Sequence, residues 1–319
     1  MTSYHIKHIT RYSYATPVID CANHIMLYPI QDAQQVLKKH ELHISQKPEV
    51  EEFTDYFGNK VGIFSVIEPI TELIIESDID IEILPVIIPA TEMPAQQQWE
   101  KLAELREQFP YMDFLAQENF EYEEEVAAVI KQVINPSLSP FEAAQLLSKY
   151  VYDNFEYTKG VTNVETKVDE IWKLKAGVCQ DFAHMLLVML RKLGIPARYV
   201  SGYICPKNHE LRGEGATHAW VEVCVPFFGW AGVDPTNNCI VSDRHVRLAI
   251  GRSFSDCTPV KGTYKGSSEH TLEVSVSIEN GQKKTEEEKA ATPVFSYTSK
   301  NPGLQTNSYR RFMEIQQQQ

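Results

Sequence analysis

A cysteine, a histidine and an aspartate in the second half of the chain carry side chains that together could do chemistry on an amide. Cys179 lies two residues after Gly177 and opens the segment CQDFAHMLLVMLRKLG. A thiol becomes a strong nucleophile as the thiolate, and a helix N-terminus together with an imidazolium favours that form. His218 begins the segment HAWVEVCV, and Asp234 ends the segment GWAGVD before Pro235. A carboxylate in this role holds an imidazole in one tautomer and one orientation.

The segments around these residues predict elements that would bring them together. The segment after Cys179 is apolar on nearly every face, so we expect a buried helix that begins at this residue. Alternating residues in THAWVEVCV and the short GWAGVD predict two strands. A hairpin between 218–225 and 230–234 would place His218 beside Asp234.

Each of these residues also has an ordinary structural explanation. A buried cysteine is most often a small hydrophobic residue, a histidine that starts a strand is often a polar edge residue, and an Asp-Pro pair is typical of a turn. The side chains of Cys179, His218 and Asp234 could also ligate a metal, but a fixed zinc would quench the nucleophile. A reacting oxyanion needs a second donor besides the Cys179 N–H, and this donor stays open, with Gln180 and Trp220 as adjacent candidates.

The remaining cysteines give no sign of a disulfide framework or a structural zinc site. The six cysteines are scattered, and no two form a C-x-x-C pair. We therefore expect free thiols in a reducing cytoplasm, with neither a metal nor another cofactor. The five cysteines outside the candidate site are Cys21, Cys205, Cys224, Cys239 and Cys257.

Composition and charge exclude several classes of partner. The 319 residues carry a formal net charge of −13 and no run of lysine and arginine, which argues against a nucleic-acid binder. No apolar stretch reaches the length of about 18 residues that a membrane span needs. The first residues are polar and alternating and lack the apolar region of a signal peptide, so we expect a cytoplasmic protein that does not bind membranes.

The hydrophobic pattern changes along the chain and predicts four segments. Residues 1–90 are rich in alternating β-formers and predict an antiparallel β domain. Three prolines within 85–94 mark its end, and a helical region follows over 91–135. Residues 136–280 read as helices and then antiparallel strands, an α+β domain, while 281–319 form a polar tail.

At this point the sequence resembles the transglutaminase-like superfamily. Its cysteine, histidine and aspartate motifs are similar to GVCQDFAHMLLVMLRKLGIPARYVSGY, THAWVEV and GWAGVDPTNN. The bacterial two-domain type of this family is similar to three further segments, YHIKHITRYSYATPVIDCANHIMLYP, DYFGN and DRHVRLAIGRSFSDCTPVKGTYKG. The resemblance covers roughly 1–280. It implies an α+β fold in which an antiparallel β-sandwich-like domain precedes a papain-like core, with Cys179 as nucleophile, His218 as general acid/base and Asp234 as orienting residue.

The resemblance also implies a reaction class. We expect a cysteine-dependent amide hydrolase or acyl transferase, such as a cysteine protease, that acts on peptide or protein amides through a thioester on Cys179. Two alternatives stay open: a transglutaminase that cross-links protein glutamines, and a non-catalytic binding module that retains the fold. The sequence names neither the substrate nor the acceptor, and it leaves the oligomeric state open.

Overall fold

The computed structural model describes residues 1–89, 93–117, 119–135, 137–162, 166–205, 212, 217–280 and 294–298. The helices are α1 (Ala95–Leu105), α2 (Glu123–Val133), α3 (Pro140–Asn154), α4 (Val168–Leu174) and α5 (Cys179–Leu193), with short 3-10 turns η1 (Asp113–Leu115) and η2 (Phe254–Asp256). The strands are β1 (Thr2–Ile25), β2 (Gln35–Ile44), β3 (Glu51–Thr54), β4 (Lys60–Val66), β5 (Ile70–Ile83), β6 (Glu156–Tyr157), β7 (Ala176–Gly177), β8 (Ala197–Ile204), β9 (Thr217–Val225), β10 (Gly229–Asp234), β11 (Cys239–Ile240), β12 (His245–Gly251), β13 (Val260–Lys265), β14 (His270–Asn280) and β15 (Val294–Thr298). This mixture of helices and antiparallel strands confirms the predicted α+β class.

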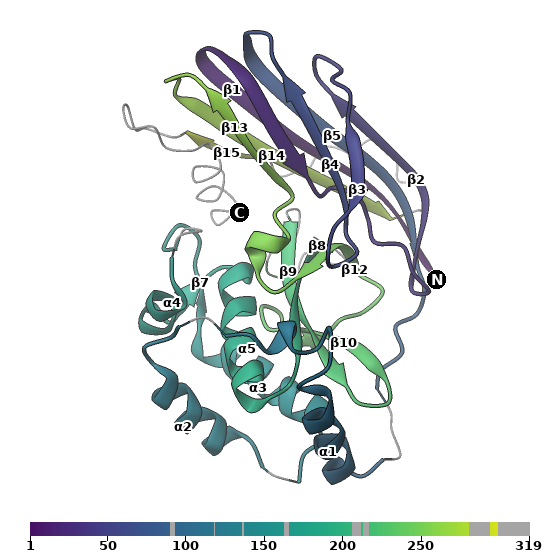
Figure 1. The fold of residues 1–319 in the computed structure, drawn as a ribbon, viewed down its shortest axis with the longest axis vertical. Helices are drawn as coiled ribbons and strands as arrows, with labels where there is room; N and C mark the ends of the chain where they lie inside the picture. Colours follow the sequence, from purple (N-terminus) through teal and green to yellow (C-terminus); the bar gives the residue numbers. More distant parts are fainter. Residues whose placement is uncertain are drawn as a thin grey trace.

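One long strand, β1, organises the N-terminal sheet. Its first half pairs antiparallel with β5 and β14, and its second half pairs with β4 and β13. The pairing with β5 is irregular between Ser13 and Val18, where β1 passes from the first set of partners to the second. The eight strands therefore form one curled antiparallel sheet whose two parts face each other across an apolar core (Figure 1).

The N-terminal sheet is completed by strands from the far end of the chain. Strands β13 and β14, from the last part of the predicted segment 136–280, pair with β1, and β15 pairs with β14. The predicted helical region 91–135 contains α1, η1 and α2. The predicted polar tail, 281–319, lies outside the described residues except for β15.

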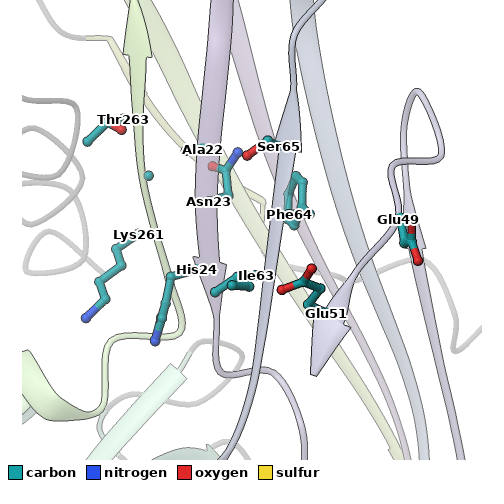
Figure 2. Close-up of a pocket in the computed structure, with 11 residues that line it drawn as sticks. Ala22, Asn23, His24, Glu49, Glu51, Ile63, Phe64, Ser65, Lys261 and Thr263 are labelled. Atoms are coloured by element: carbon teal, nitrogen blue, oxygen red, sulfur yellow. The ribbon is translucent and has the colours of Figure 1, made fainter. Parts of the chain in front are cut away.

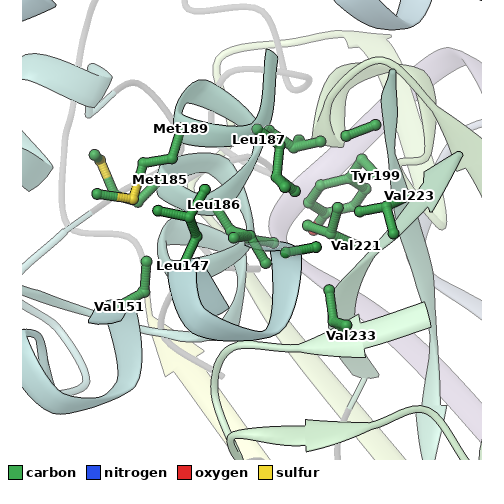
Figure 3. Close-up of a cluster of buried hydrophobic side chains, with 14 of the residues drawn as sticks. Leu147, Val151, Met185, Leu186, Leu187, Met189, Tyr199, Val221, Val223 and Val233 are labelled. Atoms are coloured by element: carbon green, nitrogen blue, oxygen red, sulfur yellow. The ribbon is translucent and has the colours of Figure 1, made fainter. Parts of the chain in front are cut away.

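The second layer is a five-stranded antiparallel sheet covered by helices. Its strand order is β11-β10-β9-β8-β12, and α5 and α3 pack over β9 and its neighbours. Figure 3 shows how the apolar side chains of α5, such as Leu186 and Leu187, meet Val221 and Val223 of β9. This packing holds the helix that carries Cys179 rigidly against the strand that carries His218. Among the residues that the structure describes, no helix has the length and hydrophobicity needed to cross a bilayer.

The other face of the five-stranded sheet packs against the N-terminal sheet. Tyr203 of β8 lies in the apolar core of the N-terminal sheet, and its hydroxyl lies 2.9 Å from Nδ1 of the buried His8. Gln35 of β2 donates from Nε2 to the carbonyl of Arg247 at 2.8 Å and accepts the Arg247 N–H at 2.9 Å. These buried hydrogen bonds fix the position of β12, which borders the candidate site.

Candidate active site

Cys179 lies at the N-terminus of the buried helix α5, as predicted. Only 8% of its surface is exposed. It is the first helical residue, so its backbone N–H belongs to the first turn, where the N–H groups have no partner within the helix. This end of a helix carries partial positive charge, and Cys179 lies at that end.

A buried aspartate holds this end of the helix in place. Oδ2 of Asp181 accepts the Val178 N–H at 2.7 Å and the Thr162 hydroxyl at 2.7 Å. Burial raises the pKa of Asp181 to about 6, although both hydrogen bonds act to lower it. A Cβ on Gly177 would lie 2.3 Å from the same carboxylate oxygen, so only glycine leaves room for the capping side chain.

His218 and Asp234 form a hydrogen-bonded pair on neighbouring strands. The predicted hairpin is present, because β9 pairs antiparallel with β10 from Val225 opposite Gly229 to Val221 opposite Val233. Nε2 of His218 lies 2.8 Å from Oδ2 of Asp234, and both side chains are fully buried. A carboxylate can only accept here, so Nε2 carries the proton and donates it to Asp234.

Asp234 receives hydrogen bonds at both of its oxygens. Oδ1 accepts the backbone N–H groups of Thr236 at 2.9 Å and Asn237 at 3.2 Å, and Oδ2 also accepts Nδ2 of Asn237 at 2.9 Å. Burial acts to raise the pKa of this carboxyl, but the charge and hydrogen bonds of His218 and the hydrogen bond of His245 outweigh burial, so the pKa is well below its usual range. Asp234 is therefore a fixed negative charge behind the His218 ring.

His245 is a further member of the site that the sequence analysis did not identify. Its Nδ1 accepts the Ser242 N–H at 3.2 Å, so Nε2 carries the ring proton and points to Oδ2 of Asp234 at 3.4 Å. Burial lowers the pKa of His245 and keeps the ring neutral at pH 7, although Asp234 acts to raise it. Its position at the start of β12, in the segment DRHVR, was the available signal.

The Cys179 side chain is close enough to the His218 ring to act on its pKa. Burial by itself lowers the pKa of His218, but the Asp234 carboxylate and the Cys179 side chain together raise it to about 10. The remaining ring nitrogen, Nδ1, is buried and has no hydrogen-bond partner. The ring thus donates to a carboxylate at Nε2, and its buried Nδ1 is left to exchange a proton.

A metal ion is the other occupant that this group of side chains could take. One ligand atom each from His218, Asp234 and His245 lie within 4.8 Å of one another. Both imidazoles, however, direct a protonated nitrogen at the same oxygen of Asp234, and that oxygen also accepts from Asn237. A metal would need these nitrogens without their protons, so the hydrogen-bonded network explains the cluster better than a ligand set.

A separate hollow lies on the outer face of the N-terminal sheet, over β1, β4 and β13 (Figure 2). His24 and Lys261 line it from neighbouring strands, and Glu51 lies on the opposite side. Burial, followed by the charge of Lys261, lowers the pKa of His24 to about 4, so this ring is neutral at pH 7. None of the three predicted site residues lines this hollow.

Comparisons with known proteins identify the fold and family. The model of the transglutaminase-like superfamily matches residues 127–235, and the model of the bacterial transglutaminase-like N-terminal region matches residues 4–82. A solved structure from Cytophaga hutchinsonii, described as a "Putative Cysteine Protease", has a TM-score of 0.70 at 19% identity and covers 89% of this chain and 92% of its own. That likeness concerns the fold.

Two mycobacterial relatives match this chain over most of their own length. "Uncharacterized protein Rv2569c" of Mycobacterium tuberculosis is 32% identical over 295 residues, covering 86% of this chain and 92% of its own. "Uncharacterized protein ML0607" of Mycobacterium leprae is 30% identical over 281 residues, covering 86% and 97%. A "Protein-glutamine gamma-glutamyltransferase" of Pseudomonas aeruginosa is 36% identical over 100 residues, which is 29% of this chain and 15% of that protein. From these family matches and full-chain relatives, the chain belongs to the transglutaminase-like superfamily.

Proposed function

We propose that this chain is a cysteine-dependent amide hydrolase or acyl transferase that acts on peptide or protein amides through a thioester on Cys179. The observation that carries the proposal is the buried His218 ring, which donates from Nε2 to Asp234 and has its pKa raised in part by Cys179. A nucleophile, a proton carrier and an orienting carboxylate in this order are the parts that acyl transfer through cysteine requires.

The first half of the reaction forms the thioester. The Cys179 thiolate attacks the amide carbonyl carbon, and the carbonyl oxygen takes up the negative charge. The tetrahedral intermediate then collapses, the C–N bond breaks, and protonated His218 gives its Nδ1 proton to the leaving amine. Asp234 holds the ring by its Nε2 hydrogen throughout.

The second half releases the acyl group. Neutral His218 takes a proton from water or from an acceptor amine as that nucleophile attacks the thioester carbonyl, and the sulfur leaves as the thiolate. Attack by water makes the chain a hydrolase, and attack by an amine makes it a transferase. Water is present at about 55 M, so hydrolysis is the default unless the bound acceptor excludes it.

The hydroxyl of Tyr157 is our candidate for the second oxyanion donor. Tyr157 of β6 pairs in parallel with Gly177, two residues before the nucleophile, and its ring packs on Phe182 at 6.1 Å. The hydroxyl is buried with no hydrogen-bond partner. Burial and then the charge of Cys179 raise the pKa of Tyr157 far above neutrality, so the phenol keeps its proton and can donate it.

Of the two donors considered from the sequence, Trp220 also has a buried Nε1 without a hydrogen-bond partner, but its ring is engaged by the histidines of the site. Trp220 packs against both imidazoles, with ring centroids 5.1 Å from His245 and 6.1 Å from His218. Gln180 is buried in the first turn of α5. We therefore assign Trp220 to packing of the His-Asp network and Tyr157 to the oxyanion.

Tyr157→Phe tests this assignment. Loss of one donor to an oxyanion typically lowers kcat by about 10²–10³-fold, because the donor acts mainly in the transition state. We expect a fall of that size with little change in KM. Tyr111→Phe, which removes a hydroxyl from a ring stacked on Trp230, should leave kcat unchanged. Equal activity of the Tyr157→Phe variant and the wild type would remove Tyr157 from the mechanism.

The similarity of part of this chain to the Pseudomonas aeruginosa relative supports a second candidate function, acyl transfer to an amine. That protein is named for transfer from glutamine, and the aligned part is a third of this chain at most. A glutamine carboxamide offers the same carbonyl to Cys179 as a peptide bond does. The choice between the two outcomes therefore depends on the acceptor.

Intact-protein mass spectrometry tests the proposal and separates the outcomes. The full chain is mixed with a pool of glutamine-containing peptides, and an acyl adduct that maps to Cys179 is expected. Release of the adduct in buffer alone indicates a hydrolase, and faster release with a transferred product on addition of a primary amine indicates a transferase. If adducts form on other cysteines, or equally on a Cys179→Ala variant, the thioester mechanism is wrong.

A further inference from the structure

The side chain of Arg212 has a buried nitrogen that the structure leaves without a partner. Nη1 of Arg212 is buried and has no hydrogen bond. The guanidinium lies over the ring of Tyr152, with its central carbon 4.4 Å from the ring centroid. No ion pair within the described part of the chain uses this arginine. A desolvated guanidinium N–H without an acceptor is costly, so the position is suited to a bound acceptor.

The backbone of Arg212 is tied directly to the candidate active site. Oδ1 of Asn237 accepts the Arg212 N–H at 2.8 Å, and Nδ2 of Asn237 donates to the Arg212 carbonyl at 3.3 Å. The same Nδ2 donates to Oδ2 of Asp234 at 2.9 Å. One carboxamide therefore fixes the arginine relative to the carboxylate that orients His218.

The guanidinium also lies within electrostatic reach of the reacting groups. The charges that act on the Tyr157 hydroxyl are those of Cys179, Arg212, Asp234 and Asp181, and Arg212 is the one that lowers the pKa of this phenol. Since the pairing of Tyr157 with Gly177 places this residue close in space to the helix that begins at Cys179, Arg212 lies in the same neighbourhood. It brings a positive charge there, although the chain as a whole carries −13.

We propose that Arg212 binds a carboxylate of the substrate close to the reacting amide. A guanidinium stacked on an aromatic face keeps its planar edge free, and that edge matches a carboxylate with two parallel hydrogen bonds. The inference rests on the proposed function, because it assigns the class of amide that reaches Cys179. The carboxylate belongs to an acidic side chain or to a free peptide C-terminus, since both offer the same two oxygens.

Peptide retention on the inactive protein tests this inference without relying on turnover. The full chain carrying Cys179→Ala is immobilised and exposed to pools of synthetic pentapeptides with a central glutamine. One pool has a free C-terminus, a second has an amidated C-terminus, and a third is amidated with glutamate beside the glutamine. Retained peptides are quantified by mass spectrometry. The first and third pools distinguish the two sources of the carboxylate.

We expect one or both carboxylate pools to be retained more strongly than the neutral pool, by roughly 10- to 100-fold, the usual range for a hydrogen bond to a charged group. Arg212→Ala on the same background should abolish this preference and leave retention of the neutral pool unchanged. Arg212→Lys should keep part of it. Arg252→Ala is the matched control, because it removes one surface positive charge that is paired with Asp256.

Equal retention of all pools, retention of none, or a preference that survives Arg212→Ala would overturn the inference. The proposed function is judged separately, by the acyl adduct on active protein. An adduct without a carboxylate preference would keep the thioester mechanism and remove Arg212 from recognition. A carboxylate preference without an adduct would keep the binding site and remove the mechanism.

Discussion

Replacing Cys179 with alanine is expected to lower amide turnover to background, a loss on the order of 10⁶-fold, because the proposed thioester forms on this sulfur. The fold should survive, since the change removes one sulfur atom from a side chain at the border of the core. Turnover is measured on the peptide that gives the adduct, and circular dichroism checks the fold.

Cys21→Ala is the matched control for this loss. Cys21 is also buried, but it lies in the N-terminal sheet on β1. This variant should keep wild-type turnover. Persistent turnover in the Cys179→Ala protein would mean that the activity does not pass through this sulfur, and the thioester mechanism on Cys179 would be wrong.

Replacing Asp234 with asparagine is expected to lower kcat/KM by roughly 10⁴-fold, the size seen when a triad carboxylate becomes a carboxamide. The carboxylate is what outweighs the effect of burial on the pKa of His218. Without it, burial dominates, the ring is neutral at pH 7, and its tautomer is no longer fixed. The amide nitrogen of the new side chain would also meet donors from His218, His245 and Asn237 that now converge on Oδ2.

Asp153→Asn provides a control for the change in charge. Asp153 forms an exposed pair with Lys149 at 2.7 Å on α3, and such pairs contribute little to stability. The control should behave as wild type in kcat/KM. A loss of less than about tenfold in the Asp234→Asn protein would show that His218 does not depend on this partner.

The same substitution predicts a pH-dependent loss of stability. Removing one member of a buried ion pair costs about 3–5 kcal/mol in unfolding free energy. The folded pKa of Asp234 is lowered, so its contribution is present above about pH 4 and is lost as the pH falls through the folded pKa. The folded pKa of His218 is raised to about 10, so its contribution is complete below about pH 6.5 and is lost as the pH rises to 10.

Denaturant unfolding of the wild type and the Asp234→Asn variant measures this difference. We expect the largest gap between about pH 4 and pH 6.5, and a steady decrease from there towards pH 10. A gap that does not change over this whole range would contradict an ion pair between these two residues.

Local patterns were sufficient to predict the parts of the site that lie on single elements. The apolar run after Cys179 gave the buried helix, and the alternation in THAWVEVCV together with the short strand after it gave the hairpin that joins His218 to Asp234. Residues in a hairpin are close in sequence, so few alternatives compete with the native pairing. The family models confirm the predicted family, and the observed helices and antiparallel strands confirm the predicted α+β class.

The other residues of the site reach it through strand pairings that the local sequence pattern does not predict. His245 reaches Asp234 because β12 pairs with β8 across the sheet, about 40 residues earlier in the chain. Tyr157 reaches the helix start through a parallel contact with Gly177 that spans only two residues. The completion of the N-terminal sheet by β13 and β14 likewise depends on pairing with β1 over the whole chain length. Period and propensity carry no information on such partners.

The central claim is that the sulfur of Cys179 is the activated one among six cysteines. Burial raises the pKa of the other five: Cys21 to about 11, Cys224 and Cys239 to about 12, and Cys205 and Cys257 well above the usual value. Cys239 is nevertheless more exposed than Cys179. If solvent access controls the reaction, Cys239 is labelled before Cys179. If activation of the thiol controls it, Cys179 is labelled first.

Competitive labelling with iodoacetamide at pH 7, followed by peptide mapping over time, is the most direct test. The account predicts that Cys179 is alkylated first and that His218→Asn slows this reaction many-fold without changing the rate at Cys239. Alkylation of Cys239 before Cys179, or a Cys179 rate that does not respond to His218→Asn, would contradict it.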